Sequence, residues 1–268
     1  EGRLTDRCTA PTPATGSAGA MWDVLAGLVA QVRRGDEAVV GAGCGGPMTP
    51  GGEAVSPLNI PAWRGFPLRG RLAELTGLPA HVDNDAKALA LGEGWVGAAR
   101  GQRDYIALVV STGVGGGIVV DGRLLDGAGG NAGHIGHVIV EPDGRLCACG
   151  ARGCLEAEAS GPSIAAVIGR PPSEADDTVR RRTGTLVGRA VASVVNLLDL
   201  RLAVVAGSVA LGYGAAFFTA AQEELDARAR IEFARGARIV PAGLGDEGPL
   251  VGAAAVGWRG VGHDVGVR

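Results

Sequence analysis

The chain has 268 residues, 46% of them hydrophobic, and carries a formal net charge of −3. This length suffices for one large or two medium domains with a sizeable core, and the acidic balance excludes the basic footprint of a nucleic-acid-binding protein. No apolar run reaches the roughly 18 residues of a membrane span, and no signal-peptide pattern occurs. We therefore expect a cytoplasmic protein with no membrane or nucleic-acid partner.

The first quarter of the chain predicts a helix, a strand and a second helix. Apolar residues recur at helical spacing over Met21–Val32, and Glu37–Gly43 is typical of a short strand. This strand leads into a glycine loop, Gly43–Met48, where backbone can approach a ligand because no Cβ intervenes. A plain turn is the alternative for this loop. The segment Leu68–Gly77 predicts the second helix, ended by its glycine.

Two acidic residues and an amide stand together at the next junction between a strand and a helix. Pro79–Val82 predicts the strand, Asp83–Asp85 reads D-N-D, and Ala86–Val96 predicts the helix. Asp and Asn are common residues at the beginning of a helix, which is the structural interpretation. A carboxylate at the carboxyl end of a strand is also where α/β folds keep their chemistry. On these residues alone the two interpretations are even.

A second glycine-rich segment follows a buried strand at Asp104–Ser111. The sequence STGVGGG is followed by IVVDGRLL, which turns back at Asp121–Gly122, so we expect a β-hairpin. The segment is neither a Walker A motif nor a G-x-G-x-x-G motif followed by a helix, which argues against those nucleotide folds. The groups that could cradle phosphate oxygens are the Thr112 hydroxyl and the backbone N–H groups of Gly113, Gly115 and Gly116.

Three of the five cysteines form a C-x-C-x4-C cluster at Cys147, Cys149 and Cys154, and His137 stands ten residues ahead of it. Three thiolates and one imidazole suit a tetrahedral structural Zn²⁺ site that leaves no open position. Buried free cysteines are less favoured because glycines surround the cluster with tight turns. Disulfides are less favoured because no secretion signal is present.

The second half of the chain alternates helices with strands, which together with the first half indicates two α/β domains. The predicted elements, in order, are helices at Ser160–Ile168 and Thr178–Leu198, a strand at Arg201–Ala206 that runs into Gly207 and Ser208, a helix at Val209–Arg230, a strand at Arg238–Pro241 and a closing helix at Pro249–Trp258.

Taken together, these motifs resemble the ROK family (repressor, open reading frame, kinase). GCGGPM, NDA, STGVGGG, AGHIGH, CACGARGCLEAEAS, VVAGS and GPLVGAAA occur in the family's order from about residue 38 to the end. The resemblance implies the two-lobed α/β fold of actin-like ATPases (ribonuclease H-like), with a zinc-binding loop. The smaller lobe would comprise residues 1–103 and 249–268, and the larger lobe residues 104–248. Most members without a DNA-binding segment phosphorylate a sugar hydroxyl.

The resemblance also assigns roles to individual residues. Asp85 would be the catalytic general base on the sugar hydroxyl, Mg²⁺ would accompany ATP, and the zinc would be structural. Relatives are commonly dimers, so we expect a homodimer. The other sugar-binding residues would be Gly46, Asn59, Asn84, His134, His137 and Glu156. The transferred phosphate would be faced by Thr112, Gly113 and Gly115, and the adenosine by Gly207 and Ser208. The metal would be bound by His137, Cys147, Cys149 and Cys154.

The chain departs from the family pattern at His134. Members that phosphorylate glucose usually carry Glu at this position, whereas AGHIGH resembles bacterial N-acetylmannosamine kinases. An anionic acceptor is thereby replaced by a possible hydrogen-bond donor. That change would suit a sugar with a different group at its first or second carbon.

A larger departure concerns the phosphate-binding loop with which the family begins. No D-x-G-G-T motif occurs before Pro11, and residues 1–4 resemble the second strand of the hairpin that should follow it. Two classes of function stay open: a sugar kinase, or a non-catalytic sugar-binding protein with a degraded or truncated nucleotide site. The intact NDA and STGVGGG favour the kinase, and a repressor is least favoured. The chain as given is expected to bind sugar but to phosphorylate it poorly.

Overall fold

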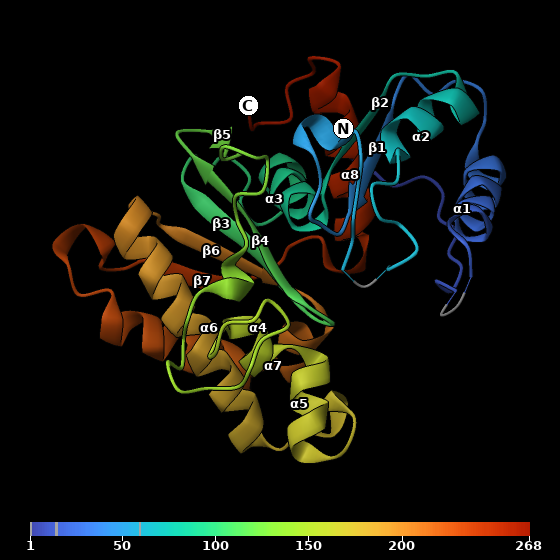
Figure 1. Cartoon of the computed structure of the whole chain (residues 1–268). Coiled ribbons are helices and arrows are strands. Elements are labelled where there is room, and N and C mark those ends of the chain that lie inside the picture. Colours follow the sequence, from blue (N-terminus) through green and yellow to red (C-terminus); the bar gives the residue numbers. More distant parts are fainter. Residues whose placement is uncertain (1, 14–15, 59) are drawn as a thin grey trace.

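The computed structural model describes residues 2–13, 16–58 and 60–268. Strands alternate with helices along the chain and form two separate sheets, one of five strands and one of two (Figure 1). The predicted α/β class is therefore confirmed. No helix in the described part of the chain combines the length and the apolar content that crossing a membrane requires.

The five-stranded sheet has the order β5-β4-β3-β6-β7. β3 pairs antiparallel with β4 and parallel with β6, and β7 is parallel to β6. The predicted Asp121–Gly122 turn is confirmed, because both residues have positive φ (52° and 69°), as the tight turn between β4 and β5 requires. The strands are β3 (Tyr105–Val110), β4 (Val114–Val120), β5 (Arg123–Leu124), β6 (Leu202–Ala206) and β7 (Arg238–Pro241).

Two long helices, α6 (Asp177–Leu198) and α7 (Ser208–Arg228), cover one face of this sheet (Figure 1). They approach closely because α6 carries glycine at the contacts. A Cβ at Gly184 or Gly188 would overlap the backbone of Phe217 or Ala221 on α7. Their apolar faces, with β3 and β6, form the largest hydrophobic core of the protein.

The two-stranded sheet consists of the parallel pair β1 (Val40–Cys44) and β2 (Ala80–Asn84). α8 (Gly248–Gly260) packs on it so closely that a Cβ at Gly41 would overlap the Ala253 carbonyl oxygen. α2 (Leu68–Thr76) and α1 (Ala18–Val32) lie farther out, at the end of the molecule opposite α6 and α7 (Figure 1).

One helix, α3 (Asp85–Val96), lies between the two sheets and contacts strands of both. Its buried Glu93 carboxylate accepts hydrogen bonds from the backbone N–H groups of Ala98 (2.7 Å), Gly243 (3.0 Å) and Leu244 (3.1 Å). Those residues belong to the two connections by which the chain passes between the sheets. Glu93 therefore holds both crossings together. We keep the division into lobes at residues 103 and 249 as a proposal.

Several boundaries differ from the sequence prediction. The helix predicted at Ser160–Ile168 is confirmed as α5 (Gly161–Ile168), whereas the short helix α4 (Leu155–Ala159) before it was not predicted; the extended Ser160 (ψ 153°) separates the two. Only Ser111–Gly113 of the glycine-rich segment forms a loop, since Gly115–Gly117 belong to β4. Glycine is needed there because α3 lies against the strand: a Cβ at Gly117 would come within 2.7 Å of the Ala90 Cβ.

The strand predicted at residues 1–4 is not found among the described residues 2–13. Gly2 has a positive φ of 69°, which interrupts an extended strand. The residues that follow it, Arg3 to Thr5, instead line a cavity of about 590 Å³ with Trp95 of α3 and Trp258 of α8.

Candidate active site

The carboxyl ends of β1 and β2 bring the glycine loop and the D-N-D motif to one edge of the small sheet. Cys44 is paired in register with Asn84, so Gly45 and Asp85 leave the sheet side by side. A Cβ at Gly46 would lie 3.4 Å from the Asn84 Nδ2 atom and 3.7 Å from the His134 Nε2 atom. The loop therefore borders the space that these two side chains enclose, and the missing Cβ keeps that space open.

The structure separates the capping role from the catalytic candidate. The Asn84 Oδ1 atom accepts from the N–H groups of Ala86 (3.0 Å) and Lys87 (3.4 Å), so Asn84 caps α3. Asp85 is the first residue of the helix, and its carboxylate accepts only from Ala86 (2.9 Å) among the described residues. Its side chain reaches the protein surface but is crowded by the surrounding protein atoms. This partial burial raises the pKa of Asp85. A raised pKa makes a carboxylate a stronger base.

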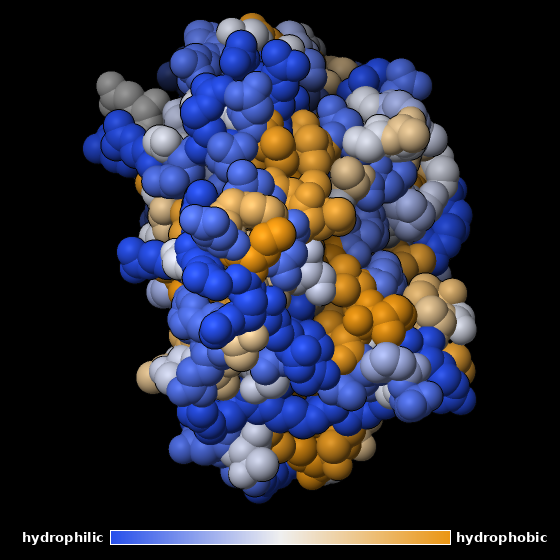
Figure 2. Space-filling model, turned by 90° about the vertical axis from the view of Figure 1, so that its left-hand side faces the viewer, coloured by the Kyte–Doolittle hydropathy of each residue, from blue (hydrophilic) through white to orange (hydrophobic). Residues whose placement is uncertain are grey.

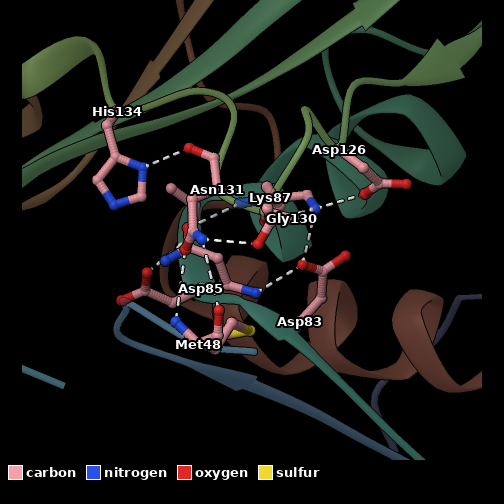
Figure 3. Close-up of polar contacts among 11 residues, drawn as sticks. Met48, Asp83, Asp85, Lys87, Asp126, Gly130, Asn131 and His134 are labelled. Atoms are coloured by element: carbon pink, nitrogen blue, oxygen red, sulfur yellow. Dashed lines mark hydrogen bonds and ion pairs between the residues drawn. The ribbon is translucent and has the colours of Figure 1, made fainter. Parts of the chain in front are cut away.

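His134 faces Asp85 across the cleft from the large sheet (Figure 3). Its Nδ1 atom lies 2.9 Å from the Asn131 carbonyl oxygen, which can only accept, so Nδ1 carries the hydrogen. In the neutral ring the Nε2 atom toward Gly46 is then an acceptor, and it donates only when the ring is protonated. The expectation that His134 supplies a donor in place of the family's Glu stays a prediction, which requires an N–H group at Nε2.

The four predicted metal ligands come together. Their ligand atoms, from His137, Cys147, Cys149 and Cys154, all lie within 4.8 Å of one another. The Cys149 and Cys154 sulfur atoms are 3.7 Å apart, and the His137 Nδ1 atom is 3.8 Å from the Cys147 sulfur. Ligands at about 2.3 Å from a tetrahedral zinc would be roughly 3.8 Å apart, so the residues fit this metal.

The loop that carries the cysteines is held by a buried carboxylate as well. Glu158 of α4 accepts from the backbone N–H of Arg145 (2.7 Å) and from the Arg182 guanidinium on α6 (2.8 Å). Burial raises the pKa of the Cys154 thiol to about 12. Zinc binds the thiolate, so a bound cation would have to displace this proton.

The predicted phosphate residues lie at the turn between β3 and β4. The Ser111 and Ser208 hydroxyl oxygens are 2.9 Å apart, which joins this turn to the beginning of α7. Gly207 has a φ of 101°, and a Cβ there would overlap the Val110 carbonyl oxygen. Together with α5 and Tyr213, these segments enclose a cavity of about 470 Å³, which Ser111, Thr112 and Ser208 line.

Two other predicted residues connect these parts. Glu156, on α4, accepts at its Oε2 atom from the backbone N–H of Val114 (2.9 Å) at the beginning of β4. Gly115 lies within β4, where a Cβ would come within 3.2 Å of the Ala86 Cβ on α3. The turn with Thr112 and Gly113 is therefore adjacent to the helix that begins with Asp85. Asn59, also predicted to bind sugar, lies outside the described residues.

Two residues that bridge the sheets, Lys87 and Asn131, were not predicted from the sequence (Figure 3). Lys87 is 2% exposed, and its ammonium group pairs with Asp83 on β2 (3.0 Å) and with Asp126 after β5 (2.6 Å). The Asn131 amide contacts the backbone N–H and C=O of Met48, both at 3.4 Å. Lys87 is the chain's only lysine, which was a signal available in the sequence, whereas nothing marked Asn131.

The chain is similar to known proteins over most of its length. The sequence pattern of the ROK family matches residues 1–258. An N-acetylmannosamine kinase from Citrobacter koseri is 37% identical over 227 residues, which cover 79% of this chain and 78% of the relative. A ROK family glucokinase from Streptomyces griseus, solved with glucose and AMPPNP, is 30% identical with a TM-score of 0.84 and covers 96% of this chain and 93% of its own. A ROK hexokinase from Thermus thermophilus is 33% identical with a TM-score of 0.76, over 94% of this chain and 90% of its own.

Proposed function

This chain belongs to the ROK family, and from that premise we propose that it transfers the terminal phosphoryl group of ATP to a hydroxyl group of an N-acetylhexosamine or a hexose. The observation that carries this proposal is the position of Asp85. Its exposed carboxylate begins α3 close to His134 and the Gly43–Gly46 loop, and the next residue, Ala86, lies against Gly115 of β4, which follows the Thr112 turn. A base in that place would lie between a sugar bound at the loop and a nucleotide bound at the turn.

The reaction assigns a separate task to each side of the cleft. Asp85 would take the proton of the attacking hydroxyl, and its raised pKa suits that task. With its Nδ1 atom directed at the Asn131 carbonyl, His134 would accept a hydrogen bond from the sugar at Nε2. Thr112 and the backbone N–H of Gly113 would face the transferred phosphate, and Mg²⁺, when bound with ATP, would neutralise phosphate charge. The protein's own contribution is then mainly position, because phosphoryl transfer needs little covalent help.

N-acetylmannosamine is our first candidate for the sugar. The curated relatives at about 37% identity are named for that substrate, and the AGHIGH segment supports the same choice. Glucose is the second candidate, since a glucokinase is the structural relative with a TM-score of 0.84. An acceptor at His134 is compatible with either sugar, because both offer hydroxyl donors.

A kinase assay tests the proposal directly. ATP-dependent phosphorylation of N-acetylmannosamine, glucose and other hexoses is measured with this chain and with its Asp85→Asn variant. We expect phosphorylation of N-acetylmannosamine that depends on Asp85. Sugar binding with no turnover in either protein would instead favour a non-catalytic sugar-binding protein. The expectation of slow turnover without a D-x-G-G-T motif stays a prediction, which rapid turnover in this assay would contradict.

We also propose that the protein is a cytoplasmic homodimer. Support for self-association comes from the outer ends of α6 and α7, where Leu197 is 79% exposed and Ile231 is 52% exposed. The Asn196 amide donates to the Arg228 carbonyl (3.4 Å), which holds these ends together. Figure 2 shows the side of the molecule on which these ends lie, where hydrophobic patches stand between hydrophilic residues. Light scattering would measure the mass, and Leu197→Glu should lower it if this surface is the interface.

A further inference from the structure

The segment from Glu156 to Gly161 follows Cys154, the last of the proposed zinc ligands. It holds both ends of the turn from Ser111 to Val114, which we call the phosphate turn. The Glu156 Oε2 atom accepts from the Val114 N–H at 2.9 Å, and the Gly161 N–H donates to the Ser111 carbonyl at 2.8 Å. Thr112 and Gly113 lie between these two contacts. The geometry of the turn that would face the transferred phosphate therefore depends on the position of α4 and the beginning of α5.

The backbone of Glu156 is in turn fixed by its neighbours. The N–H of Leu155 donates to the Val138 carbonyl (2.9 Å), and the Glu156 carbonyl accepts from Ser160 N–H (3.1 Å) and the Ser163 hydroxyl (3.2 Å). Cys154, a proposed zinc ligand, is only two residues away. The side chain thus extends from a fixed backbone toward the phosphate turn, and its carboxylate is half-buried.

The Glu156 carboxylate has one oxygen free for a second partner. Oε2 is bound to Val114, and among the described residues no hydrogen-bond donor contacts Oε1. The loop with His134 and His137 lies against the same strand, because a Cβ at Gly136 would overlap the Val114 carbonyl oxygen. Glu156 and the loop between His134 and His137 therefore lie against the two backbone polar groups of Val114, the first residue of β4.

We propose that Glu156 is a positioning residue that couples the two substrate sites, an inference that rests on the sugar kinase function proposed above. One carboxylate oxygen fixes the Val114 N–H, and the other accepts a hydroxyl of the bound sugar. A bound sugar then restricts the Glu156 side chain and with it the Thr112–Gly113 turn. Ordering the turn in advance lowers the cost of binding the nucleotide phosphates, so sugar tightens ATP binding and ATP tightens sugar binding by the same factor.

A purely structural Glu156 makes a different prediction. In that case its carboxylate would only satisfy the Val114 N–H, and removing it would lower stability without changing how one ligand affects the other. The factor by which sugar changes nucleotide affinity therefore separates the two roles. Stability, or the affinity for either ligand alone, does not separate them.

The experiment is a calorimetric titration of the zinc-loaded protein with AMPPNP and Mg²⁺, with and without saturating N-acetylmannosamine or glucose. For the wild type we expect the sugar to tighten AMPPNP binding by about fivefold or more. Glu156→Ala removes both contacts and should bring this factor to within about twofold of one. Replacing the Val114 peptide N–H by an ester oxygen should do the same while sugar still binds, because Glu156 remains.

Glu158→Gln is the matched control. It changes the neighbouring carboxylate of α4, which contacts Arg145 and Arg182 and not the phosphate turn. We expect lower thermal stability with the coupling factor retained. Zinc content and circular dichroism check that every variant is folded.

Each outcome has a defined meaning. Wild-type protein that binds both ligands with a coupling factor near one overturns the role of Glu156 and leaves the kinase proposal standing. Coupling that survives in Glu156→Ala or in the Val114 ester also overturns it. Wild-type protein that binds neither sugar nor AMPPNP refutes the proposed function, and the coupling with it.

Discussion

The two sides of the cleft are built from different kinds of groups. The proposed sugar side would present the ionisable side chains Asp85, His134 and His137, whereas the proposed nucleotide side would present a hydroxyl at Thr112 and backbone at Gly113 and Gly207. Side chains on the sugar side depend on a metal loop and on ring tautomers for their orientation. On the nucleotide side, backbone segments approach so closely that only a residue without a Cβ, glycine, fits between them. The two sides should therefore fail through different substitutions.

Removing the metal should break the sugar side most completely. Cys149→Ala is expected to lose the metal, about one zinc per chain, together with detectable sugar binding, because structural zinc stabilises small sites by roughly 10–16 kcal/mol. His137 is itself a proposed ligand, and Glu156 follows Cys154 by two residues, so we expect both to leave the site when the loop opens. Elemental analysis and calorimetry measure the two losses. Cys8→Ala, far along the chain from the cluster, is the control, and full sugar affinity in metal-free protein would contradict the argument.

Asp85→Asn should remove turnover while leaving the sugar side assembled. We expect kcat to fall roughly 10²–10⁴-fold, the usual contribution of a positioned base, with a small change in sugar affinity. Steady-state kinetics and calorimetry on the same variant test this, and unchanged turnover would make Asp85 a structural residue. Asp121→Asn is the control, since Asn also suits that Asp-Gly turn.

The same variant carries a prediction about stability. Because the folded pKa of Asp85 is raised, the folded protein binds more protons than the unfolded chain between the ordinary and the raised value. Ionisation therefore lowers stability as pH rises through that window. At neutral pH the Tm of Asp85→Asn should be unchanged or higher, as thermal melts would show.

Gly207→Ala should damage the nucleotide side selectively. The added Cβ meets the Val110 carbonyl oxygen, and φ at this residue is positive, which together cost about 1–3 kcal/mol or roughly 5–150-fold in affinity. We expect weaker AMPPNP binding and unchanged binding of sugar alone. Gly27→Ala is the matched control, since no atom lies within 4 Å of a Cβ there. Equal losses for both ligands would show that the two sides are not separable in this way.

The smallest expected effect is a shift in pH dependence. Burial raises the pKa of Asp85, so kcat/KM should fall on the acid side at a pH above the ordinary Asp value of about 4. The positive charge of His134 partly opposes that rise. His134→Gln should therefore move the acid limb to higher pH, as pH–rate profiles of the two proteins would reveal. A limb that stays in place would mean that His134 does not act on Asp85.

Sequence by itself determined most elements and the residue types of the site. The 3.6-residue periodicity of Thr178–Leu198 predicts α6 to within one residue, and Asp121–Gly122 predicts a turn that both residues adopt. The cysteine spacing predicts a cluster that the structure brings together. These features are local, because each depends on residues close in the chain.

Tertiary structure alone decided what the remaining residues do. The glycines after Val114 look like a flexible loop, yet they pair with β3 as part of β4, and only glycine fits there because α3, 25 or more residues away in sequence, lies against them. Lys87 pairs with Asp126, and Glu156 with the Val114 N–H, across separations of 39 and 42 residues. Local patterns cannot specify such contacts, since packing of the two sheets around α3 sets which backbone and side-chain groups come within hydrogen-bonding distance.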